Sequence, residues 1–244
     1  MTENTIYIIL SLIFGACFGS FITMIIHRLP QGEDIFIKRS YCPHCKKVLS
    51  FYSLIPIFSW LFQRGRCLHC KKRISIKYLL IELTTSLMFM LSYIKFGLSY
   101  NTLIIDLIIV VCIIMILTDL ENMIILDSTQ IALLILNIIL VLYNNSEDIL
   151  SYIYSSIIYF ITIFFIGYIV KKWKNMEAIG WGDIKFITVI GLSLGYSRLP
   201  LFLFISGFVG TIFGFTWKKI KKEEYFPFAP ALIISYLLIL FWDF

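Results

Sequence analysis

The sequence predicts an all-α protein that crosses a membrane several times and carries a small polar insertion after its first helix. The 244 residues are 59% hydrophobic and 15% charged, with a mean hydropathy of +0.89. A typical soluble domain is roughly 45–50% apolar and about 25% charged. Apolar runs of about 17–22 residues, long enough to cross about 30 Å of hydrocarbon, recur along the chain. A basic stretch with four cysteines interrupts them, and together these observations exclude a soluble globular protein.

About eight transmembrane helices are expected. The predicted spans are 5–26, 78–96, 101–118, 128–143, 150–170, 184–197, 199–217 and 228–243. The first is expected to remain in the protein, because it is too long for a signal peptide and lacks a basic flank and a small-residue cleavage site. We therefore expect a first transmembrane helix at 1–26, a cytoplasmic four-cysteine domain at 27–77 and a transmembrane core at 78–244.

The basic residues predict the orientation in the membrane. Of the 21 Lys and Arg residues, 19 lie in the segments 27–77, 171–185 and 218–227. Basic residues gather in cytoplasmic loops, so we expect a multi-pass protein of the cytoplasmic (inner) membrane with its N-terminus outside. Topology then accounts for the net charge of +6, and nucleic acid is not an expected partner. The basic residues of the four-cysteine domain are expected to attract anionic lipid headgroups.

The insertion carries two Cys-x-x-Cys pairs separated by 21 residues. They are formed by Cys42, Cys45, Cys67 and Cys70. Four thiolates complete the tetrahedral shell of a structural zinc ion, whereas a cytoplasmic loop does not favour disulfides. His44 and His69, inside the pairs, are expected to face solvent or support the site rather than bind the metal. Cys17 and Cys112 lie in apolar helices and are expected to act as small hydrophobic residues.

Two aspartates occur at the predicted cytoplasmic ends of two spans that cross the membrane in opposite directions. Asp119 ends the third span and Asp183 begins the sixth, and an ionisable group near hydrocarbon is costly and by default functional. Two close carboxylates that share a proton suit an aspartyl protease, because one activates water while the other polarises the scissile carbonyl. Gly180 and Gly182 would let a substrate backbone lie close to the site. Alternatively, Asp183 is only a helix cap and Asp119 only a helix end.

The chain resembles the type IV prepilin peptidases in four blocks that occur in the same order. The blocks are Gly19-Ser20-Phe21 with His27-Arg28-Leu29-Pro30; the four cysteines with Leu54-Ile55-Pro56, Tyr78 and Glu82; Asp119-Leu120-Glu121 with Asp127; and Gly180-Trp181-Gly182-Asp183 with Lys185, followed by Pro227-Phe228-Ala229-Pro230. Thr23, Leu126 and Ala229 stand where the family pattern has Asn, Pro and Gly. Because Leu126 replaces a proline, the loop after Asp119 need not have the backbone shape that is usual in the family.

The resemblance implies a function. Asp119 and Asp183 would be the catalytic pair of a Gly-x-Gly-Asp membrane protease formed by the core at 78–244, with Gly180, Gly182 and Lys185 in support. Its substrates would be type IV prepilins and pseudopilins, cut on the cytoplasmic side after the leader Gly. The four-cysteine domain would accompany N-methylation of the new terminus by S-adenosylmethionine. Glu82 is a candidate for binding substrate or methyl donor, or else a surface acid paired with a nearby lysine.

Two other functions remain open. A presenilin or signal-peptide-peptidase type of protease shares Gly-x-Gly-Asp, and Pro230-Ala231-Leu232 fits it, but its members are not expected to carry the cysteine loop. A non-enzymatic membrane scaffold with a zinc knuckle would use both aspartates as helix caps. Among the other acids, Asp106 is expected to make a polar contact between helices. Glu121 and Asp127 are expected to be solvated loop residues.

Overall fold

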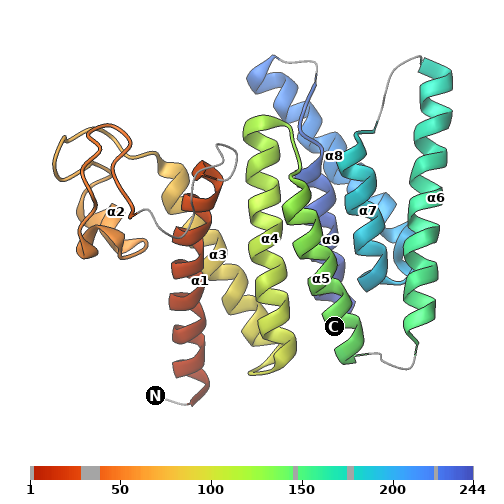
Figure 1. Ribbon diagram of the computed structural model, residues 1–244, viewed down its shortest axis with the longest axis horizontal. Helices are drawn as coiled ribbons and strands as arrows, with labels where there is room; N and C mark the ends of the chain where they lie inside the picture. Colours follow the sequence, from red (N-terminus) through yellow and green to blue (C-terminus); the bar gives the residue numbers. More distant parts are fainter. Residues whose placement is uncertain (1–2, 29–38, 145–147, 175–178, 223–224, 244) are drawn as a thin grey trace. The chain divides into compact units, whose positions relative to one another are not determined.

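The computed structural model describes residues 3–28, 39–144, 148–174, 179–222 and 225–243, and they are almost entirely helical (Figure 1). The helices are α1 (Glu3–Arg28), η2 (Phe51–Leu54), α2 (Phe58–Phe62), α3 (Ile76–Phe96), α4 (Tyr100–Asn122), α5 (Asp127–Asn144), α6 (Ile149–Lys174), α7 (Trp181–Leu194), η3 (Tyr196–Arg198), α8 (Leu199–Lys221) and α9 (Ala229–Asp243). Each predicted span overlaps one α-helix of the structure, so the predicted fold class is confirmed.

The number of full-length spans is smaller than predicted. Within the described ranges, six helices are long and apolar enough to cross a membrane, namely α1, α3, α4, α5, α6 and the helix that includes α8. The other two, α7 and α9, have 14 and 15 residues, and 14 residues reach only about 21 Å at 1.5 Å per residue. The count of about eight is therefore corrected to six long spans and two short apolar helices.

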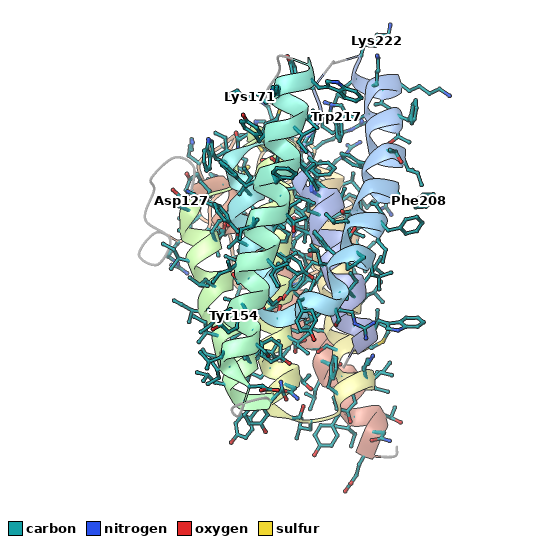
Figure 2. The ribbon with its side chains drawn as sticks, turned by 90° about the vertical axis from the view of Figure 1, so that its right-hand side faces the viewer. Asp127, Tyr154, Lys171, Phe208, Trp217 and Lys222 are labelled. Carbon is teal, nitrogen blue, oxygen red and sulfur yellow. The ribbon has the colours of Figure 1, made fainter. Side chains whose placement is uncertain are left out.

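The long helices are apolar around most of their circumference, as expected for helices whose solvent is lipid. Tyr154 on α6 and Phe208 on α8 are exposed and point away from the helices (Figure 2). Lys171 and Lys222 lie at the C-terminal ends of α6 and α8, at one end of this group of helices (Figure 2). Outward apolar side chains between polar ends define a multi-pass membrane protein.

Contacts divide the chain into two compact units, Met1–Ile114 and Met115–Phe244. The predicted three-part division at residues 26 and 77 stays a prediction. In the first unit, α1 packs along α3, and glycines allow the close approach. A Cβ added at Gly15 or Gly19 would lie only 2.6 Å from a Cα atom of α3. Small residues four apart let membrane helices approach closely, and the Ser86 hydroxyl donates to the Leu12 carbonyl at 2.8 Å across this interface.

Gly19→Leu is expected to destabilise the first unit, because any Cβ at position 19 collides with the backbone at Glu82. Overpacking of this kind typically costs about 1–3 kcal/mol, and a leucine adds three carbons beyond the Cβ. Thermal unfolding of the detergent-purified protein measures the loss. Gly207→Leu is the matched control, since a Cβ there meets nothing within 4 Å; equal melting temperatures for the two variants would contradict the close packing.

In the second unit, α7 packs against α5, α6 and α9 (Figure 1). Hydroxyl groups of α6 bond to the backbone of α7, as in the 2.7 Å bond from Ser155 Oγ to the Gly191 carbonyl. On another side, the hydroxyl of Tyr236 on α9 donates to Asn137 Oδ1 of α5 at 2.8 Å. Interhelical polar bonds stabilise packing in membranes, where lipid gives helices no hydrophobic reason to associate. These neighbours hold the short helix that carries Asp183.

Candidate active site and metal centre

Two tight turns of the same shape present the four cysteines. In the first turn the N–H of Cys42 donates to the Lys47 carbonyl at 2.9 Å, and in the second the N–H of Cys67 donates to the Lys72 carbonyl at 2.9 Å. Each turn carries Cys-x-His-Cys-Lys-Lys, and an antiparallel bridge closes each one. The insertion is therefore built from a duplicated cysteine turn, which the spacing of the pairs alone does not reveal.

The four thiols are arranged to hold one metal ion. Their sulfur atoms all lie within 4.8 Å of one another, and the Sγ atoms of Cys42 and Cys70 are 3.9 Å apart. A tetrahedral site with Zn–S bonds of about 2.3 Å requires sulfurs about 3.8 Å apart. The described residues include no second group of this kind. His44 and His69 are exposed and outside the group. Cys17, which is exposed, and Cys112, which is buried, also lie outside it.

Electrostatics at the cluster favour a cation. Backbone N–H groups of Cys70 and His69 lower the pKa of the Cys67 thiol to about 6. At Cys70 the Lys72 N–H lowers the pKa, but burial and the neighbouring cysteines outweigh it and raise the pKa to about 11. One thiolate thus forms readily, whereas further thiolates repel it. A bound cation removes this repulsion, so metal binding is accompanied by proton release.

Glu82 anchors the cysteine domain to the helix pair α1 and α3. Its Oε2 accepts a 2.6 Å hydrogen bond from the N–H of Ile57, which precedes α2, and its carboxylate also accepts from the Ser20 side chain. Ile57 has φ +63°, a conformation that a β-branched residue adopts rarely. The buried carboxylate therefore holds an otherwise unfavourable turn. The role of Glu82 in binding substrate or methyl donor stays a prediction.

Asp119 lies in the last turn of α4 and is only 6% exposed. Its Oδ2 accepts a 3.0 Å hydrogen bond from the N–H of Ala229, the first residue of α9. The first N–H groups of a helix have no partner within the helix and form the positive end of its dipole. The start of α9 therefore stabilises negative charge on Asp119.

Asp183 is the third residue of α7, whose N-cap is Gly180. The Asp183 carboxylate accepts from the Gly180 N–H and experiences the like-charge repulsion of Asp119. A carboxylate at this position that accepts from the N–H of the cap residue stabilises the start of a helix. This contact therefore also fits the alternative interpretation, in which Asp183 caps the helix. Both carboxylates are thus held at helix N-termini within electrostatic range of each other.

The helix α7 begins earlier than predicted. It runs over Trp181–Leu194 instead of 184–197, because Gly180 supplies the cap and Gly195, with φ +74°, ends the helix. Similarly, α4 continues to Asn122 past the predicted end at 118. Asp119 and Asp183 therefore sit on rigid helical turns, where their carboxylates are held more firmly than in loops.

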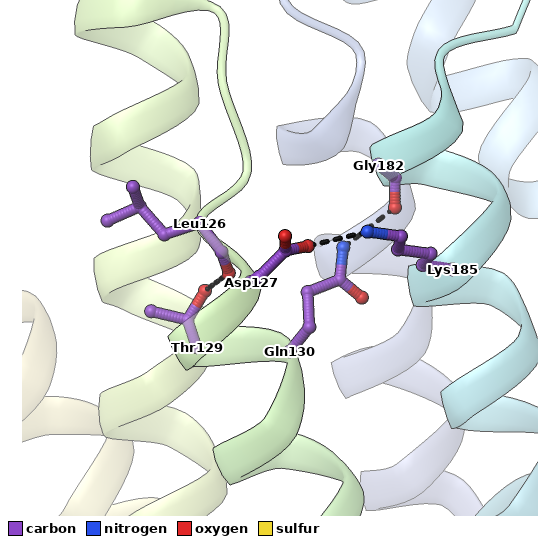
Figure 3. Close-up of polar contacts among 6 residues, drawn as sticks. All are labelled: Leu126, Asp127, Thr129, Gln130, Gly182 and Lys185. Atoms are coloured by element: carbon purple, nitrogen blue, oxygen red, sulfur yellow. Dashed lines mark hydrogen bonds and ion pairs between the residues drawn. The ribbon is translucent and has the colours of Figure 1, made fainter.

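The first turn of α5 is tied to the start of α7 by two polar contacts (Figure 3). Gln130 Nε2 donates to the Gly182 carbonyl at 2.8 Å, and Lys185 Nζ pairs with Asp127 Oδ1 at 2.6 Å. A Cβ at Gly182 would lie 3.3 Å from Ile125 Cβ, so this glycine lets the loop pass close to Asp183. The Asp127 carboxylate is therefore paired rather than free in solvent.

Leu126, which stands where the family pattern has proline, directly precedes α5 and bonds to its first turn. Its carbonyl accepts from the backbone N–H groups of Thr129 and Gln130, and from the Thr129 hydroxyl at 2.7 Å (Figure 3). The other predicted residues lie elsewhere. Glu121 is exposed, Asp106 interacts with Ser92 of α3, and Leu29 and Pro30 of the first block are outside the described residues.

Two contributors to the site were missed by the sequence reasoning. One is the backbone N–H of Ala229, which belongs to a block that was recognised but given no role. The other is Gln130, 5% exposed, whose Oε1 is buried without a partner among the described residues. A glutamine near the start of an otherwise apolar helix was the available signal for it.

Gln130→Leu is expected to impair the site more than Lys185→Met, although each removes one contact to α7. The Gly182 carbonyl would lose its buried partner, which typically costs about 1–3 kcal/mol. The lysine pair is exposed, and such pairs contribute about 0–1 kcal/mol. Thermal unfolding and the rate of the reaction proposed below measure both variants. A larger loss for Lys185→Met would show that the exposed pair, not the buried amide, holds the loop.

Comparison with known proteins places this geometry in a family. The model of the Bacterial Peptidase A24 N-terminal domain matches residues 13–96, which include all four cysteines. The model of the Type IV leader peptidase family matches residues 107–215, which include both aspartates. The chain belongs to the type IV leader peptidase family. The first match ends with α3 and the second begins within α4, and together they cover most of this leader peptidase, as the resemblance in the sequence predicted.

Full-length relatives of this leader peptidase carry one shared name. The chain is 27% identical to the "Prepilin leader peptidase/N-methyltransferase" of Stutzerimonas stutzeri over 97% of this chain and 91% of the relative. It is 29% identical to the protein of that name from Vibrio cholerae over 97% of each chain, and 29% identical to that of Legionella pneumophila over 97% of this chain and 91% of the relative. No solved structure matches the chain.

Proposed function

We propose that this protein cleaves the leader peptides of type IV prepilins and pseudopilins after the leader Gly, with Asp119 and Asp183 as the catalytic pair. The observation that carries the proposal is that these two carboxylates, held at the N-termini of α9 and α7, lie within range of each other's electrostatic repulsion. Family membership and the name shared by the relatives support the substrate class.

The proposed mechanism uses one proton shared between the two carboxylates. The ionised carboxylate takes a proton from water as the water oxygen attacks the carbonyl carbon of the leader Gly. The protonated carboxylate donates a hydrogen bond to the carbonyl oxygen, which becomes negative. The C–N bond then breaks and the new amine takes up a proton from the pair. Repulsion between the carboxylates favours the singly ionised pair that this reaction requires.

A second activity, N-methylation of the new terminus with S-adenosylmethionine as donor, is part of the proposal. It is supported by the names of the relatives. We also propose that the metal of the four cysteines is a structural zinc ion, supported by the four-sulfur donor set and its spacing. Zinc would hold the two cysteine turns together and supply no step of the cleavage.

The proposed location is the cytoplasmic membrane, with the N-terminus outside and both the cysteine domain and the aspartates on the cytoplasmic side. The basic ends of α6 and α8 support this orientation. The family match favours a leader peptidase over a presenilin-type protease. The non-enzymatic scaffold with a zinc knuckle, in which both aspartates are helix caps, is likewise not favoured, because relatives along 97% of the chain are named as enzymes.

Co-expression with a type IV prepilin tests the proposal. Intact mass spectrometry of the pilin should reveal loss of the leader in the presence of this protein and an unchanged precursor in its absence. A further gain of one methyl group on the new N-terminal residue would establish the second activity. An uncut prepilin beside well-folded membrane-inserted protein would refute the proposed substrate class.

A further inference from the structure

The cysteine domain exposes a continuous apolar segment between its two cysteine turns. In η2 and α2 the most exposed side chains are Phe51 at 79%, Tyr52 at 79% and Phe62 at 84%, and Phe58 and Leu61 are also exposed. We refer to these five side chains as the aromatic face. On the other side of α2, the Trp60 ring packs so closely on Gly65 that a Cβ there would lie 2.7 Å from it. The five-residue helix therefore separates a packed side from an uncovered apolar side.

The start of α2 lies at the level of a membrane-spanning helix. The 2.6 Å bond between Glu82 and the Ile57 N–H fixes the start of α2 to α3. Glu82 is six residues into α3, or about 9 Å from its first residue at 1.5 Å per residue. Consistently, α2 lies below the upper ends of α1 and α3 and not beyond them (Figure 1). Interfacial helices bury their apolar face about 5–10 Å into the boundary between headgroups and acyl chains.

The charge of the cysteine domain fits a lipid surface. Residues 39–81 contain nine Lys and Arg residues and no Asp or Glu. On the Trp60 side of α2, Arg64, Arg66 and Arg73 line a hollow of about 570 Å³ that is also lined by Ile76, the first residue of α3. Aromatic side chains with adjacent basic residues are the composition that favours the membrane interface, where anionic headgroups attract Lys and Arg.

We propose that the aromatic face is inserted into the interface of the leaflet at which α1 ends and α3 begins. The cysteine domain is then not a free cytoplasmic insertion: Glu82 holds it against α3 at one side, and lipid covers its aromatic face at the other. A large exposed apolar patch otherwise favours association with another protein. The absence of Asp and Glu from residues 39–81 and the depth of α2 favour lipid as the occupant. This inference does not depend on the proposed protease activity.

Depth-dependent fluorescence quenching in the full-length protein tests the inference. Phe62→Trp and Phe51→Trp are reconstituted in nanodiscs of phosphatidylglycerol and phosphatidylcholine, with or without brominated acyl chains, and the wild-type emission is subtracted. Bromine should quench the added emission of both variants. Leu68→Trp is the control, since Leu68 is exposed on the second cysteine turn outside the aromatic face, and its added emission should be unchanged. Equal quenching of all three tryptophans, or none at positions 51 and 62, would overturn the inference.

Photo-cross-linking in cells distinguishes lipid from a protein partner without changing the packed residues. Benzoylphenylalanine replaces Phe62 in the intact protein, and mass spectrometry identifies the adduct. A phospholipid adduct at position 62, absent when the probe is at Leu68, supports the inference. An adduct with a prepilin or with a second copy of this chain overturns it and assigns the aromatic face to that partner.

Discussion

Replacing Asp119 or Asp183 by Asn is expected to abolish leader cleavage while the protein stays folded. Neither Asn can take a proton from water, and general acid–base catalysis typically contributes about 10²- to 10⁴-fold to a rate. Because the two carboxylates act as one unit, the double variant should be little worse than either single variant. The rate of prepilin conversion by purified protein, followed by mass spectrometry, measures all three.

Asp106→Asn is the matched control, a carboxyl lost from the same helix about 20 Å from Asp119 at 1.5 Å per residue. It should retain cleavage. Thermal unfolding of each variant separates loss of catalysis from loss of folding, and Asn at position 183 retains an oxygen that accepts the Gly180 N–H. Substantial cleavage by either active-site variant would leave the aspartates as helix caps and refute the proposed pair.

Cys42→Ser and Cys67→Ser are expected to remove the bound metal and loosen the cysteine domain. Structural zinc contributes about 10–16 kcal/mol to the folding of isolated zinc-finger peptides, and the duplicated turn has little other core. Elemental analysis of the purified protein should change from one zinc ion per chain to none. Limited proteolysis should then cut within residues 39–75.

Cys17→Ser is the control for this experiment, because Cys17 lies in α1 outside the four-thiol group. It should keep the metal. Metal affinity should also fall as the pH is lowered, since protons compete with the metal for the four thiolates. Wild-type protein purified without any stoichiometric metal would contradict the proposed centre.

Most of the fold was predictable because the length and the apolarity of membrane helices identify them in the sequence. The segments around α4 and α6 are apolar on every side, so their positions required no knowledge of packing. The short helices α7 and α9 were harder, because tertiary contacts decide where they begin. Asp183 was expected at the edge of a helix, whereas the Gly180 cap places it inside the first turn.

The candidate site was predictable only where side-chain chemistry is unusual for its surroundings. Carboxylates near hydrocarbon and paired cysteines stand out in this sequence, and Asp119, Asp183 and the cysteine turns were identified for that reason. Backbone groups carry no such signal. The N–H of Ala229 reaches Asp119 across 110 positions of sequence, and the N–H of Ile57 meets Glu82 across 25. Pairings of this kind depend on how helices approach one another.

The bond between Asp119 and Ala229 has a consequence for biogenesis. A nascent chain that has been synthesised only as far as α8 contains both aspartates but lacks the donor at the start of α9. We therefore expect the proposed catalytic pair to be complete only after α9 has entered the membrane. During insertion, when apolar segments of other proteins emerge from the same translocation machinery, the immature protease is expected to be inactive toward them.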